Sequence, residues 1–454
     1  MDKLLFKRID LWLVVLIVVM LLLSMLAFGA IVRDRAFGHN RFGAIGEISF
    51  QIASLPAEAG RELQRLMSDD VAGMSTLHSE EFEGRSGWEF SDSRLDSGLD
   101  GYLLFSRHDG DAGHHVFELV DLKSGTVEHR IDLDASVLFS QVEHISRFGN
   151  PEDWQSHRFQ AVHPLPLENG DLLVKGNSPM VRMSPCGEPI WTIDQSIFHH
   201  TIEPGLDGEF WTSSYMEEHR IDGLPNRFVD PGITKFSGDG EVLFDRSLAE
   251  VMIKADLAPL FLSYQLPMND PLHLNDVEPV LEDGPYWKRG DVFLSIRHLS
   301  VIMLYRPSTD EVIWWKQGPW MAPHDVDIID ATTISIFNNN AYNLHGGSFV
   351  QGLSQINYYD FATDTVSRPF KEALEAQNFK NEAAGLFTLL PDGHYYVDQS
   401  EFGRTMIFTP DGELVVEHIN RAENGLIYHL GWSRYLERDK GDQFLKQLRA
   451  ADCE

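Results

Sequence analysis

The side chains with the greatest chemical capacity in this chain are histidines that precede short apolar runs. The sequence contains 19 histidines, so a single histidine carries little information, and most are solvated or hydrogen-bonded structural groups. Their positions are more informative. A histidine opens a predicted strand at His163, at His199 and His200, at His273 and at His324. If these runs are structural repeats, the imidazoles lie at equivalent positions and several face one common site.

An arginine and an asparagine accompany these histidines. Arg297 follows the apolar run of "LSIRHLS", and Asn275 lies within "HLND". Imidazole, guanidinium and amide groups together suit a tetrahedral oxyanion, because their N–H groups stabilise spread negative charge. A neutral imidazole can also act as a nucleophile or base. A metal site is the less favoured use, since Arg297 would repel a cation and no HxH or HExxH pattern appears.

The elements that must position these groups are short strands. From about residue 88, β-rich runs alternate with Gly, Asp, Asn and Pro turns, which is typical of hairpins. Hairpins are predicted at 117–133, 180–193, 233–245, 301–315, 356–370 and 406–419. Most follow another short strand, at 101–107, 170–176, 208–214, 290–298, 332–338 and 393–399. This all-β pattern predicts a six-bladed β-propeller with its site at one end of the central channel. A sandwich with irregular insertions is the rival fold.

Composition limits the class of protein. The chain has 454 residues, 43% hydrophobic, with a formal net charge of -32. Such a charge argues against a nucleic-acid partner, because phosphate binding needs clustered Lys and Arg. The two cysteines, Cys186 and Cys453, lie far apart in the sequence. They indicate neither a disulfide framework nor a metal-ligand spacing.

The N-terminus predicts a membrane span. Residues 11–32 carry no charge and are long enough to cross a bilayer. A retained anchor is favoured over a cleaved signal, with the body outside the cytoplasmic (inner) membrane, on the periplasmic side. The expected layout is a cytoplasmic N-terminus (1–10), the transmembrane anchor (11–32), a short helical neck and linker (33–87), the propeller (88–435) and a C-terminal helix or tail (436–454). Further helices are expected within 246–273 and 370–387.

Five motifs in order resemble a known family. "FHHTIEP", "LHLNDVEP", "SIRHLS", "GPW…PHDV" and "SIFNNN" resemble the bacterial PAPS-independent arylsulfate sulfotransferases over about residues 160–420. The resemblance implies a six-bladed propeller that transfers a sulfuryl group from an aryl sulfate to a phenol through a sulfohistidine, with no cofactor. It also implies roles for individual residues. His324 matches the nucleophilic histidine. The groups that would bind the sulfuryl oxygens are His273, Asn275, Arg297 and one of His199 and His200, which the sequence does not distinguish.

The chain departs from the family pattern in places. It has "NNN" (338–340) where the family often has an Asp-Asn-Gly turn, and Asp325 directly follows His324. The Asp325 carboxylate is expected to raise the pKa of the imidazole. A membrane anchor replaces the N-terminal β-domain of the secreted members. Three tryptophans could flank an aryl ring or lie in the core, which is the more usual place for buried aromatics: Trp314, Trp315 and Trp320.

Two functions of different classes remain open. The first is a membrane-anchored sulfotransferase that acts on a small aryl sulfate donor and a phenolic or other hydroxyl acceptor. The second is a non-catalytic anchored propeller that binds an anionic, sulfated ligand or a partner protein. The two differ in the effect of removing the His324 side chain, which would abolish turnover in the first and leave binding intact in the second. The ordered set of His, Asn and Arg residues favours the enzyme.

Overall fold

The computed structural model describes residues 10–36, 41–53, 55, 74–76, 78–218, 221, 222, 224, 228–262, 269–344 and 347–453. The chain divides into two compact units, Met1–Asp69 and Asp70–Glu454. Each is described by itself below.

The first unit contains a long apolar helix, α2 (Leu11–Ala36). By length and composition it is able to cross a membrane, and a signal sequence near the N-terminus would meet the same criteria. The predicted helix is therefore present. Residues 43–53 are also helical. Residues 37–40, 54, 56–73 and 77 of the predicted neck, and residues 1–9 of the predicted cytoplasmic segment, lie outside the described residues.

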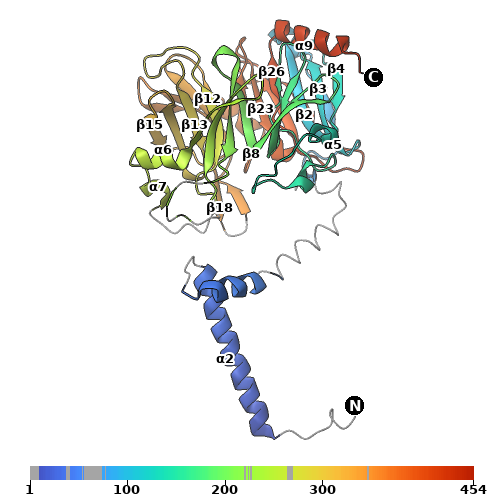
Figure 1. The fold of residues 1–454 in the computed structure, drawn as a ribbon. Coiled ribbons are helices and arrows are strands. Elements are labelled where there is room, and N and C mark those ends of the chain that lie inside the picture. The colour runs from blue at the N-terminus through green and yellow to red at the C-terminus, as the bar shows by residue number, and fades with distance from the viewer. Residues whose placement is uncertain are drawn as a thin grey trace. The chain divides into compact units, whose positions relative to one another are not determined.

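The second unit is an all-β body of small antiparallel sheets (Figure 1). Three sheets have four strands each. They are formed by β26 (Arg434–Leu436), β2 (Tyr102–Asp109), β3 (His114–Asp121) and β4 (Thr126–Asp132); by β12 (Leu274–Pro279), β13 (Val292–Ile296), β14 (Val301–Arg306) and β15 (Glu311–Gln317); and by β16 (Pro323–Ile328), β17 (Thr333–Asn338), β20 (Gln355–Asp360) and β21 (Thr365–Ser367).

The other sheets are larger or smaller. A five-stranded sheet has the order β1 (Gly87–Phe90), β25 (Leu414–Ile419), β24 (Arg404–Phe408), β23 (Tyr395–Gln399) and β22 (Leu386–Leu389). A seven-stranded sheet has the order β11 (Val242–Ser247), β10 (Pro231–Ser237), β9 (Glu209–Tyr215), β8 (Pro189–Pro204), β7 (Ser178–Met183), β6 (Leu172–Val174) and β5 (Leu165–Pro166). A two-stranded hairpin pairs β18 (Ala341–Leu344) with β19 (Gly347–Val350).

This arrangement is propeller-like. Most strands that follow one another in the chain are hydrogen-bonded neighbours in the same sheet, and the β18–β19 hairpin is inserted between β17 and β20 of one sheet. Two sheets also join the ends of the body, because β26 pairs with β2 and β1 pairs with β25. The described strands make four blade-like sheets of four or five strands and the seven-stranded sheet.

The core lies between neighbouring sheets because the inner strands are apolar on both faces. All residues of β13, for example, are buried. The outer strand β15 instead alternates between exposed and half-buried residues, as expected for a sheet with one solvated face. Packing of buried side chains from adjacent sheets supplies the apolar burial that stabilises the fold.

Helices lie in the connections and at the C-terminus. They are α4 (Ser93–Ser97), α5 (Ala135–Leu138), α6 (Leu248–Lys254), α7 (Pro259–Leu262), α8 (Lys371–Ala376) and α9 (Arg438–Ala450), with short 3-10 turns at η2 (Pro151–Trp154), η3 (Leu206–Gly208), η4 (Arg297–Leu299) and η5 (Ser400–Phe402). Phe444, Leu445 and Leu448 of α9 are buried against the β2–β4 sheet. In the body, α9 lies at the opposite end from the β18–β19 hairpin (Figure 1).

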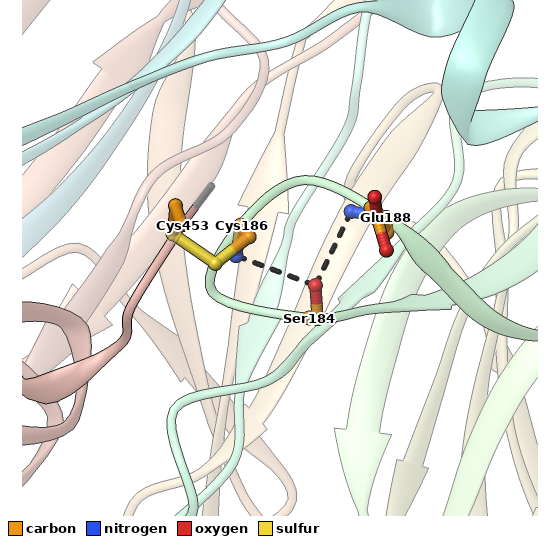
Figure 2. The surroundings of a disulfide bond; sticks show 4 residues. All are labelled: Ser184, Cys186, Glu188 and Cys453. Carbon is orange, nitrogen blue, oxygen red and sulfur yellow. Dashed lines mark hydrogen bonds between the residues drawn. A yellow bond between two sulfur atoms is a disulfide. The ribbon is translucent and has the colours of Figure 1, made fainter.

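The two cysteines form a disulfide, which corrects the sequence expectation. Cys186 and Cys453 are 267 residues apart in the chain, yet their Cα atoms are 5.4 Å apart. Cys186 lies in the turn between β7 and β8, where the Ser184 hydroxyl accepts the backbone N–H groups of Cys186 and Glu188 (Figure 2). Sequence separation was uninformative because β26 and α9 bring the C-terminus back to the start of the body.

Candidate functional site

Irregularities in three inner strands aim the predicted side chains. The strand register shifts between His199 and Ile202 in β8, between Leu274 and Asp276 in β12, and between Pro323 and Val326 in β16. Such bulges turn side chains out of the regular alternation. They carry His200, Asn275 and His324, which lie within the shifted segments.

The predicted equivalence of the histidines is wrong for His324. His200 (φ 61°), inside β8, and His273 (φ 55°), directly before β12, themselves adopt the left-handed conformation. In the next sheet that conformation falls on Ala322 (φ 52°), two residues before His324. Hydrophobic patterns locate a strand but do not reveal a bulge, so the sequence placed His324 two residues out of register.

The structure brings the predicted histidines together around His200. Ring centroids of His200 lie 5.8 Å from His324, 5.2 Å from His273 and 4.9 Å from His199. His199 also packs against Tyr215, with ring centroids 4.3 Å apart. The Nδ1 atoms of His199 and His200 are 2.6 Å apart, so one donates and the other accepts. Of these two histidines, His200 is the one whose ring faces His324.

His324 is buried, neutral and held in one tautomer. Its Nδ1 lies 2.7 Å from Asn339 Oδ1. The Asn339 amide NH2 donates to the carbonyl oxygens of Asn381 (3.0 Å) and Ala384 (2.7 Å), so its oxygen must face the imidazole. His324 therefore donates from Nδ1. Burial, with the nearby Arg297 charge, holds the pKa of His324 well below its usual value. Its Nε2 is buried without a hydrogen-bond partner, which leaves a lone pair free for nucleophilic attack.

Asp325 does not raise the pKa of His324, contrary to the sequence expectation. One carboxylate oxygen of Asp325 accepts the backbone N–H of Phe387 at 3.1 Å. Burial and the neighbouring Asp327 raise the pKa of Asp325 well above its ordinary value, which favours its neutral form. Alternation along β16 separates the two adjacent side chains, and the imidazole is hydrogen-bonded to Asn339 instead.

Arg297 and Asn275 both retain uncommitted polar atoms. Arg297, 6% exposed, donates from Nη1 to His298 Nε2 (2.8 Å) and from Nη2 to the Glu382 carbonyl (3.3 Å), and its Nε has no partner. Asn275 donates from Nδ2 to the Pro323 carbonyl at 3.0 Å, and its Oδ1 has no partner. Buried polar groups are usually hydrogen-bonded, so these atoms are suited to a polar ligand.

Asp270 organises the groups on the other side of His273. Its Oδ1 accepts the backbone N–H of His273 (3.0 Å), and its Oδ2 lies 2.5 Å from His273 Nδ1. Its carbonyl oxygen lies 2.6 Å from His298 Nδ1. Burial, followed by the charge of His273, lowers the pKa of His298 to about 4. The neutral imidazole therefore donates from Nδ1 to Asp270 and accepts the Arg297 N–H at Nε2.

The same three side chains are close enough to be considered as metal ligands. Ligand atoms of Asp270, His273 and His298 lie within 4.8 Å of one another. Both nitrogens of His298 are already engaged, one by the Asp270 carbonyl and one by Arg297. A cation at His298 would have to displace the positively charged guanidinium. These contacts favour a hydrogen-bond network over a metal centre.

Sequence reasoning missed three contributors to the site. Asn339 was part of the quoted "SIFNNN" motif but received no role. Trp432, two residues before β26, adopts the left-handed conformation (φ 58°), and its ring centroid lies 5.5 Å from that of His200 and 6.0 Å from that of His324. Lys175 is fully buried and donates to the His200 carbonyl oxygen. The sequence position of Lys175 could have indicated it, because Lys175 directly follows strand β6 just as Arg297 directly follows strand β13.

The tryptophans considered as aryl-binding groups lie elsewhere. Trp320 is 2% exposed and packs in an apolar core cluster with Trp314 at its edge. Trp315 is 39% exposed on the outer strand β15. The core alternative therefore holds for Trp314 and Trp320, and Trp432 is the aromatic side chain that borders His324.

Two surface hollows, of about 570 and 520 Å³, lie beside α9 and beside α6. Neither is lined by the histidine cluster. The candidate site is therefore assigned from the chemistry of buried, partly uncommitted side chains and not from the size of a cavity.

A family model described as "Arylsulfotransferase (ASST)" matches residues 163–421, the segment that holds the whole histidine cluster. No curated protein matches the chain significantly.

Several solved structures share a general likeness at low identity. One is a protein of unknown function from Bacteroides caccae, with 8% identity, TM-score 0.46 and coverage of 74% of this chain and 99% of the other. Another is TolB from Acinetobacter baumannii, with 10% identity, TM-score 0.41 and coverage of 74% and 65%. A third is the WD40 β-propeller domain of Doa1, with 11% identity, TM-score 0.38 and coverage of 79% and 99%.

Proposed function

This chain belongs to the arylsulfotransferase family, and on that premise we propose that it moves a sulfuryl group from an aryl sulfate to a phenolic or other hydroxyl acceptor. The transfer is independent of PAPS and passes through a sulfohistidine at His324. One observation carries the proposal. The unprotonated Nε2 of His324 is buried, without a partner, in a neutral imidazole whose other nitrogen is committed to Asn339.

In the first step, the His324 Nε2 lone pair forms a bond to sulfur while the bond between sulfur and the aryl oxygen breaks. The electron pair of that bond stays on the departing aryl oxygen. Negative charge on the sulfuryl oxygens is stabilised by Arg297 and by N–H groups of the surrounding side chains. Those other groups are His273, His200 and the second N–H of the Asn275 amide, whose first N–H goes to the Pro323 carbonyl. His199 fixes the tautomer of His200 through their Nδ1 contact.

In the second step, the acceptor hydroxyl attacks the same sulfur atom. The bond between sulfur and Nε2 breaks, the imidazole recovers its lone pair, and the acceptor proton passes to a base. Splitting one transfer into two displacements at one nitrogen is the advantage of covalent catalysis. Trp432 borders the reacting ring and is placed to contact an aromatic donor or acceptor.

The proposal is tested by following 4-nitrophenol release from 4-nitrophenyl sulfate, with and without phenol, using the detergent-solubilised full chain. Release that requires phenol and disappears in His324→Ala supports sulfuryl transfer. Saturable binding of the sulfate ester that survives in His324→Ala, with no turnover by the wild type, would favour the non-catalytic binding protein instead. A buried histidine remote from the cluster, His418, provides the matched control substitution.

We also propose that the body counts as six blades spanning about residues 88–435. The long strand β8 pairs with β7 through its first part and with β9 through its last part. Treating β8 as shared by two consecutive blades divides the seven-stranded sheet and brings the total to six.

The proposed location is the periplasmic side of the inner membrane, with residues 11–32 as a single-pass anchor and residues 33–87 as the neck. The apolar helix α2 supports the anchor. The disulfide between Cys186 and Cys453 supports an extracytoplasmic body, because disulfides persist in oxidising compartments. Protease protection of the body in intact spheroplasts would contradict this placement.

A further inference from the structure

We propose that Asp270 and His273 form an acid–base dyad that carries the proton to and from the bridging oxygen of the proposed sulfuryl transfer. Asp270 is the positioning residue, and His273 Nε2 is the atom that gains and loses the proton. The inference rests on the proposed function and adds a role that oxyanion binding by His273 does not include.

The first support is that Asp270 makes two hydrogen bonds with His273. Its carboxylate accepts both the backbone N–H and the Nδ1–H of His273, at 3.0 and 2.5 Å. Two contacts to one histidine fix the position of the main chain and the plane of the ring together. An ionised carboxylate can only accept hydrogen bonds, so His273 must hold a proton on Nδ1. The exchangeable position is then Nε2.

The second support is the electrostatic state of Asp270. Burial on its own would raise the pKa of Asp270, but the hydrogen bond from His273 and the nearby imidazoles outweigh burial and hold the pKa below its ordinary value. The carboxylate therefore remains charged. A charged carboxylate stabilises the imidazolium that forms when the ring accepts a proton, as in other carboxylate–histidine pairs.

The third support is the position of His273 relative to the nucleophile. The His273 ring lies 5.2 Å from His200, and the His200 ring lies 5.8 Å from His324. His273 and His324 thus both border the His200 ring, and the charge of His273 acts on His324. In an in-line displacement the leaving oxygen lies on the far side of sulfur from the nucleophile, so a proton donor must be set apart from His324.

The neighbouring groups are less suited than His273 to carry the proton. His199, His200 and His298 are buried and their pKa values are lowered, first by burial. His298 is also committed at both nitrogens, and Arg297 does not release a proton at physiological pH. Among the described histidines of the cluster, His273 has the charged carboxylate partner.

The proton balance closes over the two steps. The Nε2–H of His273 imidazolium protonates the departing aryl oxygen as its bond to sulfur breaks, which releases a neutral phenol. The resulting neutral His273 then removes the proton of the acceptor hydroxyl as that oxygen bonds to sulfur. The dyad returns to its starting state with no other proton donor.

The test compares donors that differ in how much their leaving group needs a proton. Phenyl sulfate releases a phenol with a pKa of about 10, whereas 4-nitrophenyl sulfate releases a more acidic phenol that leaves readily as the anion. In Asp270→Asn, the amide oxygen accepts the backbone N–H of His273, so the amide NH2 faces His273 Nδ1. The His273 ring must then accept at Nδ1 and carry its proton on Nε2, which is the opposite tautomer. We expect kcat/KM for phenyl sulfate to fall about 100-fold or more, and that for 4-nitrophenyl sulfate to fall less than about 5-fold.

Two further variants separate this role from folding. Asp392→Asn removes a carboxylate from another histidine, His394, whose Nδ1 is 3.0 Å from Asp392, and it should affect both donors equally and slightly. His273→Gln should reproduce the donor-selective loss. The double variant Asp270→Asn/His273→Gln should be no slower than His273→Gln alone, because the two residues act as one unit.

The outcomes distinguish this inference from the proposed function. Wild-type protein that transfers sulfuryl groups, with Asp270→Asn and His273→Gln reducing both donors by the same factor, would overturn the dyad and leave the sulfotransferase intact. Wild-type protein with no phenol-dependent release from either donor would overturn both.

Discussion

His324 Nδ1 lies 2.7 Å from Asn339 Oδ1, and both N–H bonds of the Asn339 amide are already committed to main-chain carbonyls. The asparagine is therefore fixed in one orientation, and it fixes the imidazole in one tautomer. Because Asn339 directly follows β17 and His324 lies in β16, this contact ties the nucleophile to its neighbouring strand. The lone pair on His324 Nε2 is therefore available because Asn339 holds the proton of the ring on Nδ1.

Replacing Asn339 with alanine should slow sulfuryl transfer about 100-fold by letting the His324 ring rotate and change tautomer. KM for the donor should change little, because Asn339 does not face the ligand. Nitrogen NMR of the wild-type imidazole should show the proton on Nδ1, and the variant should show a mixture. A matched control is Asn420→Ala, since Asn420 also bridges buried carbonyls, of His108 and Tyr428, away from the cluster. Equal losses of activity in the two variants would contradict the role given to Asn339.

The disulfide should stabilise the body without taking part in chemistry. Cys453→Ser should lower the free energy of unfolding by about 2–4 kcal/mol, since cross-linking residues far apart in the chain restricts the unfolded state. Transfer activity at 25 °C should be unchanged. Denaturant titration of wild type and variant, each with and without reducing agent, provides the measurement. If the reducing agent weakens the variant as much as the wild type, the stabilisation comes from something other than the disulfide.

Buried carboxylates beside the site should make stability depend on pH. Burial, then the charge of Glu203, raises the pKa of Asp276 from 3.8 to about 7. The folded state therefore binds more protons than the unfolded state between these values, and the stability contributed by Asp276 is lost as pH rises through 7. Asp276→Asn should gain about 2 kcal/mol of unfolding free energy relative to wild type between pH 5 and pH 8.

Asp109→Asn is the control for this pH effect. Although burial of Asp109 opposes ionisation, Arg107 and Arg130 lower its pKa below the ordinary value. It is thus ionised in both the folded and unfolded states over pH 5–8, and the stability change in this variant should be constant over that range. A constant difference for Asp276→Asn as well would show that Asp276 does not hold a proton in the folded state.

Removing metal ions should not affect transfer. His298 already takes the Arg297 N–H at Nε2, and the proposed steps use only side chains. Dialysis against EDTA should leave kcat within experimental error of the untreated protein. Loss of activity that added Zn²⁺ restores would instead assign Asp270, His273 and His298 to a metal centre.

Local patterns in the sequence predicted most of the sheet structure, because strand periodicity and turn residues are local properties. The runs 101–107 and 290–298 correspond to β2 and β13, and the helices expected in 246–273 and 370–387 are α6, α7 and α8. The bulges that aim His200 and His324 could not be predicted, since inner strands buried on both faces lack the regular alternation that an inserted residue would interrupt.

Contacts between distant residues were the other limit. The pairing of Cys186 with Cys453 and the approach of Trp432 to His324 depend on how the chain ends meet. The orientation of Asn339 depends on carbonyls from residues 381 and 384, more than forty positions away. Such contacts are properties of the closed body and have no local signature.

The most direct test of the account is to trap the covalent intermediate. The full chain is incubated with 4-nitrophenyl sulfate in the absence of an acceptor and quenched at high pH, because acid cleaves the N–S bond of a sulfohistidine. The quenched protein is then digested for mass spectrometry. The account predicts one added SO3 group on the peptide that contains His324, absent in His324→Ala and removed when phenol is added before the quench. Phenol-dependent transfer with no such adduct, or with the adduct on another residue, would contradict the central role of His324.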